Sequence, residues 1–277
     1  MYSINCNGTL VDFSSPKVMG ILNLTPDSFF DGGKYSSEKD IIIQVEKMIS
    51  EGATFIDIGA YSSRPGAKSI SEEEELNRIL PIIKTLVKAF PKIIISIDTF
   101  RSNVVKQCVL NGAAIINDIS GGNLDKNMFK TIAKLQVPYI IMHMQGNPTN
   151  MQLKPTYHNI VQELLFYFSD KIEQLRKLGV NDIITDVGFG FGKTLEHNYQ
   201  LLHHLQMFQN LDVPTLAGIS RKSMLYKPLQ IEPKSALNAT TSANTIALMN
   251  GANILRVHDV KEAMDCIKIV DLLKNNS

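Results

Sequence analysis

Polar and charged side chains recur at the ends of short apolar segments along this chain. The set comprises Asn23, Asp57, Asp98, Asn117, His143, Asp186, Lys222, Arg256 and His258. If these segments are parallel strands of one closed sheet, their carboxyl ends meet at one mouth and the side chains face a shared site. A single polar residue after a strand often only caps the next helix. Because nearly every segment ends this way, a site explains the pattern better than capping.

Asp98 and Asn117 follow apolar segments and are costly to bury without a partner. A carboxylate accepts two parallel N–H bonds from an amino-pyrimidinone edge, and an amide supplies a donor and an acceptor together. The pair therefore favours recognition of a flat, hydrogen-bonding heterocycle. Lys222 can donate to a ring carbonyl or nitrogen, and the alternative for it is a surface lysine on a loop.

Arg256 and His258 are two residues apart, so in an extended segment both side chains point to the same side. That pairing suits an anion such as a diphosphate, and an arginine can also stack on a ring. The alternative for Arg256 is a structural pair with a carboxylate.

The glycine-rich segment Gly188–Lys193 lacks the spacing of a P-loop. Its glycines let the backbone approach a ligand closely, and Phe189 or Phe191 can line a pocket wall. A core position is the stronger interpretation of Phe189. No zinc-hydrolase or serine-hydrolase motif is present, so neither class is supported.

Apolar β-branched segments and amphipathic segments alternate along the whole chain. The first kind predicts buried parallel strands, at Val18–Asn23, Phe55–Gly59, Ile93–Asp98, Ile115–Asn117, Tyr139–His143, Ile183–Asp186, Thr215–Gly218 and Ile254–Val257. The second kind predicts helices, at Ser37–Glu51, Leu76–Phe90, Arg101–Asn111, Asn127–Leu135, Leu164–Leu175, Thr194–Phe208, Ser235–Asn250 and Val260–Lys274.

The helix around Leu76–Phe90 has a capping box at Ser71 and Glu74, and Pro81 is expected to kink or shorten it. Glu72–Glu75 is interpreted as a solvated helix start that favours the positive end of the helix dipole.

Eight strand–helix units with short connections predict one (β/α)8 TIM barrel, an α/β fold with a single domain over residues 1–277. A doubly wound sheet is the competing layout, but the segment after Asn23 lacks the phosphate fingerprint that usually follows its first strand. Thr25–Tyr35 and Gly146–His158 are the longest irregular segments and are expected to act as lids over the site.

Composition restricts the partners and the compartment. The formal net charge of +1 gives no global field to attract nucleic acid or an anionic membrane, so we expect neither partner. The three cysteines are odd in number and far apart, which fits a reducing compartment. No leader-like or membrane-length apolar segment is present, and we expect a cytoplasmic protein.

Eight segments together resemble the dihydropteroate synthase family of pterin-binding (β/α)8 barrels. They follow the family's order and extend over nearly the whole chain, at Gly20–Phe29, Ser63–Gly66, Asp98–Thr99, Ile116–Ile119, Met142–Pro148, Asp186–Lys193, Ser220–Ser223 and Arg256–Asp259. The first, sixth and seventh are highly specific.

The resemblance implies a transferase of folate biosynthesis that joins a dihydropterin diphosphate to 4-aminobenzoate, giving dihydropteroate and diphosphate. It also implies a Mg²⁺ ion, a homodimer and inhibition by sulfonamides. The pterin and diphosphate residues that it implies are Ser63, Asp98, Asn117, Asp186, Lys222, Arg256, Val257 and His258, of which Asp98, Asp186 and Lys222 are catalytic. It assigns Asn23 to the metal and assigns the 4-aminobenzoate side to Phe29, Ser63, Arg64, Pro65, Phe191 and Ser223.

Three positions depart from the family pattern: Tyr61 stands where a Glu is common, Ser63 replaces a Thr, and Val187 replaces a Pro. None removes a hydroxyl or carboxylate assigned to substrate. Two alternatives stay open, a methyltransferase domain that acts on methyltetrahydrofolate with a corrinoid partner and a catalytically silent pterin-binding paralogue. Each is disfavoured because the segments Thr25–Tyr35 and Ser62–Ala67 are both present.

Overall fold

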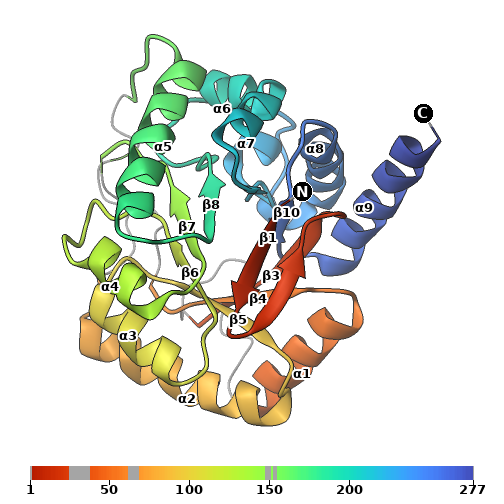
Figure 1. Cartoon of the computed structure of the whole chain (residues 1–277). Helices are drawn as coiled ribbons and strands as arrows, with labels where there is room; N and C mark the ends of the chain where they lie inside the picture. The colour runs from red at the N-terminus through yellow and green to blue at the C-terminus, as the bar shows by residue number, and fades with distance from the viewer. Residues whose placement is uncertain (1, 25–37, 62–68, 147–150, 152–154, 277) are drawn as a thin grey trace.

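The computed structural model describes residues 2–24, 38–61, 69–146, 151 and 155–276 of the chain. Within them, eight parallel strands close into a barrel in the order β10-β3-β4-β5-β6-β7-β8-β9 (Figure 1). Helices follow the strands and surround the barrel on its outside. The eight-stranded α/β barrel predicted from the sequence is therefore confirmed.

Each predicted barrel strand is present, and no boundary differs from the expectation by more than one residue. The strands are β3 (Lys17–Asn23), β4 (Phe55–Gly59), β5 (Ile94–Asp98), β6 (Ile115–Asp118), β7 (Tyr139–Met142), β8 (Ile183–Asp186), β9 (Thr215–Ala217) and β10 (Ile254–Val257).

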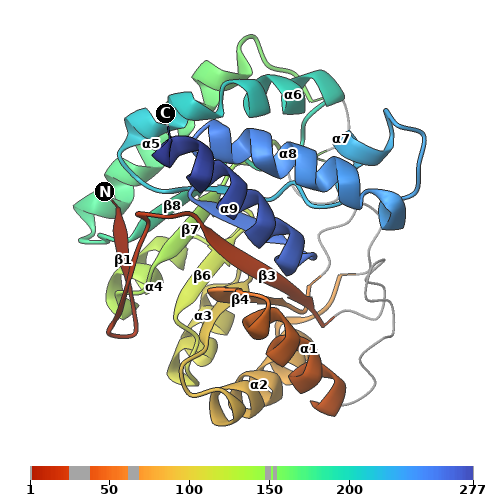
Figure 2. The ribbon, with the colours of Figure 1, turned by 90° about the vertical axis from the view of Figure 1, so that its right-hand side faces the viewer.

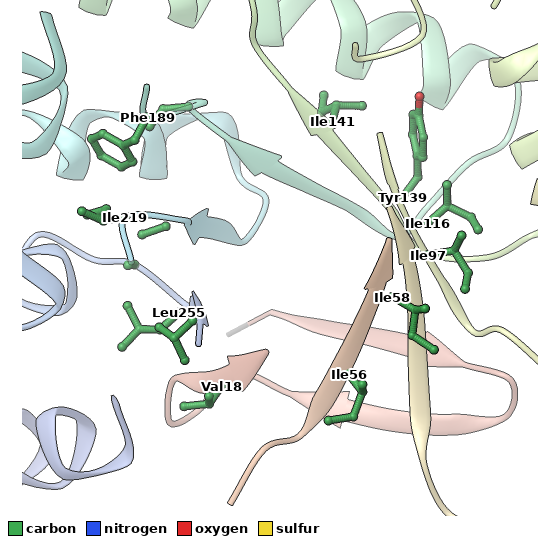
Figure 3. Close-up of a cluster of buried hydrophobic side chains, with 14 of the residues drawn as sticks. Val18, Ile56, Ile58, Ile97, Ile116, Tyr139, Ile141, Phe189, Ile219 and Leu255 are labelled. Atoms are coloured by element: carbon green, nitrogen blue, oxygen red, sulfur yellow. The ribbon is translucent and has the colours of Figure 1, made fainter. Parts of the chain in front are cut away.

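Successive side chains on each strand point alternately into the barrel and out toward the helices, as the pleat requires. The inward set fills the amino-terminal half of the barrel with Met19, Phe55, Ile115, Ile140, Ile184, Leu216 and Ile254. The outward set packs against the helices and includes Val18, Ile56, Ile58, Ile97, Ile116, Tyr139, Ile141 and Leu255 (Figure 3). Inward positions nearer the carboxyl ends carry polar residues, so the sequence itself divides the barrel into a packed base and a polar mouth.

The described helices are α1 (Glu38–Ser50), α2 (Glu72–Ala89), α3 (Ser102–Leu110), α4 (Met128–Leu135), α5 (Ile160–Lys177), α6 (Leu195–His203), α7 (Ser223–Tyr226), α8 (Leu237–Met249) and α9 (Val260–Asn275), with 3₁₀ helices η1 (Leu205–Leu211) and η2 (Pro233–Ser235). The single helix expected over Thr194–Phe208 is divided into α6 and η1, and α7 was not predicted. Among these described helices, none is both long and apolar enough to cross a membrane.

Helix α2 has the cap expected at Ser71 and is not shortened at Pro81, but it differs from its prediction at Glu75. It continues through Pro81 to Ala89, so the proline does not end it. Ser71 caps it by accepting from the backbone N–H of Glu74. The solvated helix start expected at Glu72–Glu75 is wrong for Glu75, whose side chain is buried and pairs with Arg101.

A hairpin of β1 (Ser3–Cys6) and β2 (Thr9–Asp12) precedes the barrel and was not predicted. Its turn is Asn7-Gly8, both with positive φ, which is the usual chemistry of a two-residue hairpin turn. Ile4, Cys6 and Val11 pack against the apolar base of the barrel. Figure 2 shows the hairpin at the amino end of β3, away from the carboxyl ends of the strands.

Candidate active site

Arg256, on β10, reaches into the barrel toward two carboxylates of neighbouring strands. Its Nε donates to Oδ2 of Asp57 on β4 at 2.7 Å, and its Nη2 donates to Oδ2 of Asp98 at the end of β5 at 2.9 Å. The structural pairing with a carboxylate, weighed as an alternative for Arg256, is therefore present. The pairing does not bury Arg256 completely: its side chain keeps 17% exposed, and that of Asp98 keeps 22%.

Asp57 is the centre of this network and is fully buried. Besides Arg256, its carboxylate accepts from Oγ of Ser96 at 2.5 Å and from Nδ2 of Asn117 at 3.0 Å. Three donors satisfy its charge, which a buried carboxylate requires. Through Asp57, the side chains of Asn117 and Arg256 are fixed relative to each other.

Burial raises the pKa of Asp98 to about 7, and the carboxylates of Asp57 and Glu75 act in the same direction. The guanidinium of Arg256 opposes that shift. Asp98 thus has a pKa near neutral pH and a side chain that is partly exposed at the mouth. A shifted pKa of this kind is common at functional sites.

Asp186 ends β8 on the other side of the mouth, where it accepts from the backbone N–H of Gly188 at 2.8 Å. Burial raises its pKa, and the charge of Lys222 opposes this. Burial lowers the pKa of Lys222 to about 8, with Asp186 acting in the opposite direction. Asp186 and Lys222 thus act on each other electrostatically, and both were site candidates from the sequence.

The amine of Lys222 donates to the carbonyl oxygen of Phe189, and its Nζ lies 4.7 Å from the ring centroid of Phe191. Phe189 is fully buried in the core, as expected, whereas Phe191 is partly exposed and packs beside Met142 and Met144. Phe191 is therefore the aromatic residue of this segment that can form a pocket wall.

The glycines of Gly188–Lys193 were expected to let the backbone approach a ligand. At Gly188 the structure gives a different reason: φ is +70°, and a Cβ there would lie 2.1 Å from the carbonyl oxygen of His143. Close packing of this segment on the end of β7 is what excludes a side chain at Gly188.

Lys193 connects the segment Gly188–Lys193 to the end of β7. Its Nζ contacts Nδ1 of His143 at 3.2 Å, the carbonyl oxygen of His143 at 3.1 Å and that of Phe191 at 2.9 Å. Burial lowers the pKa of Lys193 to about 7 and the pKa of His143 to about 3. His143, a candidate from the sequence, thus supports the wall that carries Phe191.

The remaining predicted residues differ in how they face the mouth. His258 pairs through Nδ1 with Oγ of Ser220 at 3.0 Å. Ser223 is partly exposed and begins α7 directly after Lys222. Val257 is fully buried in the core between strands and helices, so only its backbone can reach a ligand.

Asn23 ends β3 and is partly exposed at the mouth. Within the part of the chain that the structure describes, no three His, Cys, Asp or Glu side chains converge to hold a metal. Mg²⁺ is commonly held by one or two protein oxygens together with waters and substrate phosphates. The carbonyl oxygen of Asn23 fits that mode, whereas a site made only of protein ligands is not present among the described residues.

The residues Phe29, Ser63, Arg64 and Pro65 lie outside the described residues, as do most of the two segments expected to act as lids. Asp57 was recognised as a strand-end candidate but received no role. Its signal was its position two residues before the end of a strand, which points it into the barrel.

The chain is also similar in sequence to proteins of known function. Residues 19–258 match the family model described as "Pterin binding enzyme". Dihydropteroate synthase of Escherichia coli (strain K12) is 42% identical over 95% of this chain and 94% of that protein.

Solved structures agree. Dihydropteroate synthase of Yersinia pestis in complex with a sulfonamide drug superposes with a TM-score of 0.95, at 40% identity over 99% of this chain and 100% of the other. The Xanthomonas albilineans enzyme with 4-aminobenzoic acid gives a TM-score of 0.90, at 35% identity over 98% of both chains.

The fold and the polar mouth define a pterin-binding (β/α)8 enzyme. Within that class, the chain belongs to the dihydropteroate synthase family. Its activity is accordingly that of a transferase of folate biosynthesis.

Proposed function

We propose that the mouth of this barrel binds a dihydropterin diphosphate and joins it to 4-aminobenzoate, releasing diphosphate. The observation that carries the proposal is that the ion pair of Asp98 with Arg256 and the opposite charges of Asp186 and Lys222 converge at the same end of the barrel. Asn117 adds an amide between them, held by Asp57.

In this proposal the pterin ring lies flat across the mouth. Asp98 or Asp186 accepts the paired N–H groups of its amino-pyrimidinone edge, Asn117 completes the polar contacts, and Lys222 donates to a ring carbonyl or nitrogen. Arg256, whose Nη2 donates to Asp98, stacks on the face of the ring in this proposal.

The reaction breaks the C–O bond to diphosphate and forms a C–N bond to the amine, which then loses a proton. As the leaving group departs, the methylene carbon attached to the pterin ring becomes electron-poor, and the carboxylates of Asp98 and Asp186 stabilise the positive charge that spreads into the ring. Arg256 and His258 bind the departing diphosphate. Asn23 would be a ligand of a Mg²⁺ ion, which when bound would neutralise part of the leaving group's negative charge. The amine is already nucleophilic, so no strong base is needed.

The 4-aminobenzoate side is proposed to lie beside Phe191 and Ser223, with Phe29, Ser63, Arg64 and Pro65 completing it. The partly exposed ring of Phe191 next to Lys222 supports this, because it offers an apolar wall beside the pterin position. The Val257 backbone contributes to the pterin side.

Competition tests the proposal. A sulfonamide imitates 4-aminobenzoate, so it should bind more tightly once pterin diphosphate and Mg²⁺ are present, and excess 4-aminobenzoate should displace it. Calorimetry measures both effects. Sulfonamide binding that 4-aminobenzoate does not displace would contradict the proposed site.

The protein is further proposed to be a homodimer. Helices α8 and α9 pack side by side and expose large apolar side chains, namely Ile246, Met249, Ile269, Leu272 and Leu273. A second copy covering them would remove this surface from water. Light scattering should give twice the chain mass for the native protein and one chain mass for Ile269→Asp; a monomeric native protein would overturn the proposal.

A cytoplasmic location is proposed because the cysteines form no disulfide. All three are free and buried, and burial raises the pKa of Cys6 and of Cys108 to about 12, which keeps both as thiols. Fractionation of producing cells should recover the activity with cytoplasmic markers, and recovery elsewhere would contradict the proposal.

A further inference from the structure

Arg101 lies three residues after Asp98 and contacts two residues that are nine positions apart in the chain, Tyr61 and Ile70. They lie on either side of the segment 62–68. Its Nη2 donates to the carbonyl oxygen of Ile70, on the carboxyl side of that segment, at 2.7 Å. On the amino side, its Cζ lies 5.5 Å from the ring centroid of Tyr61. One guanidinium therefore contacts Tyr61 and Ile70 at the same time.

The guanidinium is itself held by a buried carboxylate. Nη1 of Arg101 donates to Oε2 of Glu75 on α2, whose side chain is 1% exposed. Burial raises the pKa of Glu75, while Thr99 and Arg101 oppose that shift. A buried carboxylate stays charged only beside a fixed cation, so Glu75 keeps Arg101 in place.

Aromatic packing connects this cluster to the pocket wall. Tyr61 and Phe100 form an edge-to-face pair with ring centroids 5.1 Å apart, and Cζ of Arg101 lies 5.2 Å from the Phe100 centroid. Phe100 packs against the same methionine-rich cluster as Phe191. Arg101 thus lies behind the aromatic wall proposed for 4-aminobenzoate and not at the pterin contacts.

A second arginine touches only one end of the segment. Nη1 of Arg78 on α2 lies 3.4 Å from the carbonyl oxygen of Ala60, and Nη2 of Arg78 pairs with Glu74. It offers a matched comparison, because it has the same side chain and a contact at the amino end alone.

We propose that Arg101, held by Glu75, is a positioning residue for 4-aminobenzoate: it fixes Tyr61 and Ile70 relative to Phe100 and thereby sets the amine side of the pocket. The inference rests on the proposed function. It adds a specific expectation, namely that Arg101 governs affinity for 4-aminobenzoate and leaves pterin affinity unchanged.

The test is a split between the two substrates in Arg101→Gln. The KM for 4-aminobenzoate and the inhibition constant of a sulfonamide should both rise about tenfold, because they report binding on the amine side. The Kd for the pterin diphosphate, measured by calorimetry without the amine, should stay within about twofold of the native value. Arg78→Gln should leave all three constants within about twofold.

Equal losses for both substrates in Arg101→Gln, or an unchanged KM for 4-aminobenzoate, would overturn the proposal. So would an equal rise in Arg78→Gln, because a contact at one end would then suffice. If Arg101→Gln does not fold because Glu75 is left unpaired, the double variant Glu75→Gln/Arg101→Gln and the single variant Tyr61→Ala replace it. Each should weaken binding of 4-aminobenzoate and leave pterin binding unchanged, and equal losses for both substrates would again overturn the proposal. Calorimetry measures the Kd values of the sulfonamide and of the pterin diphosphate without turnover, so the split between them is testable even if the native protein proves inactive, an outcome that contradicts the proposed function alone.

Discussion

Nε of Arg256 lies 2.7 Å from Oδ2 of Asp57, a carboxylate that is fully buried inside the barrel. Asp57 is two residues before the end of β4, so it lies one layer deeper than Asp98, which is paired with Gly59 in the sheet. From that depth it fixes Arg256 and Asn117 together. The polar mouth is therefore supported by a charge that substrate does not need to touch.

Asp57→Asn tests this support. The amide keeps the shape but loses the charge that orients Arg256, so kcat/KM for the pterin substrate should fall about 100-fold and the free energy of unfolding by about 1–3 kcal/mol. Ser96→Ala is the matched control, because it removes another donor to the same carboxylate and leaves Arg256 in place. If both variants lose activity equally, orientation of Arg256 is not the cause.

Asp98→Ala should abolish turnover while the fold persists. The variant removes a carboxylate expected to accept two N–H groups of the pterin, so calorimetry should show at least about a 100-fold loss of pterin affinity. Its unfolding midpoint should change little, because burial already disfavours the charged form of Asp98 and Arg256 keeps Asp57 as partner. The exposed Glu73→Ala should match the native protein, and native pterin affinity in Asp98→Ala would refute its role.

The pH profile of kcat/KM for the pterin substrate should be bell-shaped. Asp98 has its pKa raised to about 7, so below that pH it takes up a proton and loses its acceptor. Lys222 has its pKa lowered to about 8, so above that pH it loses its charge. Since kcat/KM reports groups of the free enzyme, both limbs should appear there. Lys222→Gln should lose the alkaline limb; retention of that limb would assign it to another group.

Lys193 should make stability depend on pH. Its pKa is lowered to about 7, whereas an unfolded lysine titrates near 10.4. Between these values the unfolded state binds more protons, so the contribution of Lys193 to stability rises as pH increases from 7 and is weakest below 7. The stability that the native protein has over Lys193→Met should therefore be about 2–3 kcal/mol larger at pH 9 than at pH 6.5, as measured by urea unfolding. A difference independent of pH would contradict a neutral, buried Lys193.

Much of the fold was predictable because parallel strands of a closed sheet are short, β-branched and apolar on both faces. This pattern located every barrel strand to within one residue at each end. The hairpin was missed because its strands are short, although Asn7-Gly8 is a strong turn signal. Glu75 also had a signal. It lies four residues before Ile79 and seven before Ile82, both buried, so the helical period places it on the core face.

The site was predictable at the level of residue type and strand end, because topology alone brings the carboxyl ends of the strands together. Partners were not predictable. That Arg256 contacts Asp57 as well as Asp98 depends on the depth of each residue inside the barrel, and that Gly188 packs on His143 depends on how two loops meet. Such contacts between distant segments leave no periodic signal in a single sequence.

The central claim is that this chain couples loss of diphosphate to attack by an aromatic amine. The most direct measurement is diphosphate release from the dihydropterin diphosphate with Mg²⁺, in the presence and absence of 4-aminobenzoate, together with mass-spectrometric detection of dihydropteroate. We predict release that depends on the amine and matches the dihydropteroate formed. Tight pterin binding without amine-dependent release would contradict the claim and identify a silent pterin-binding protein.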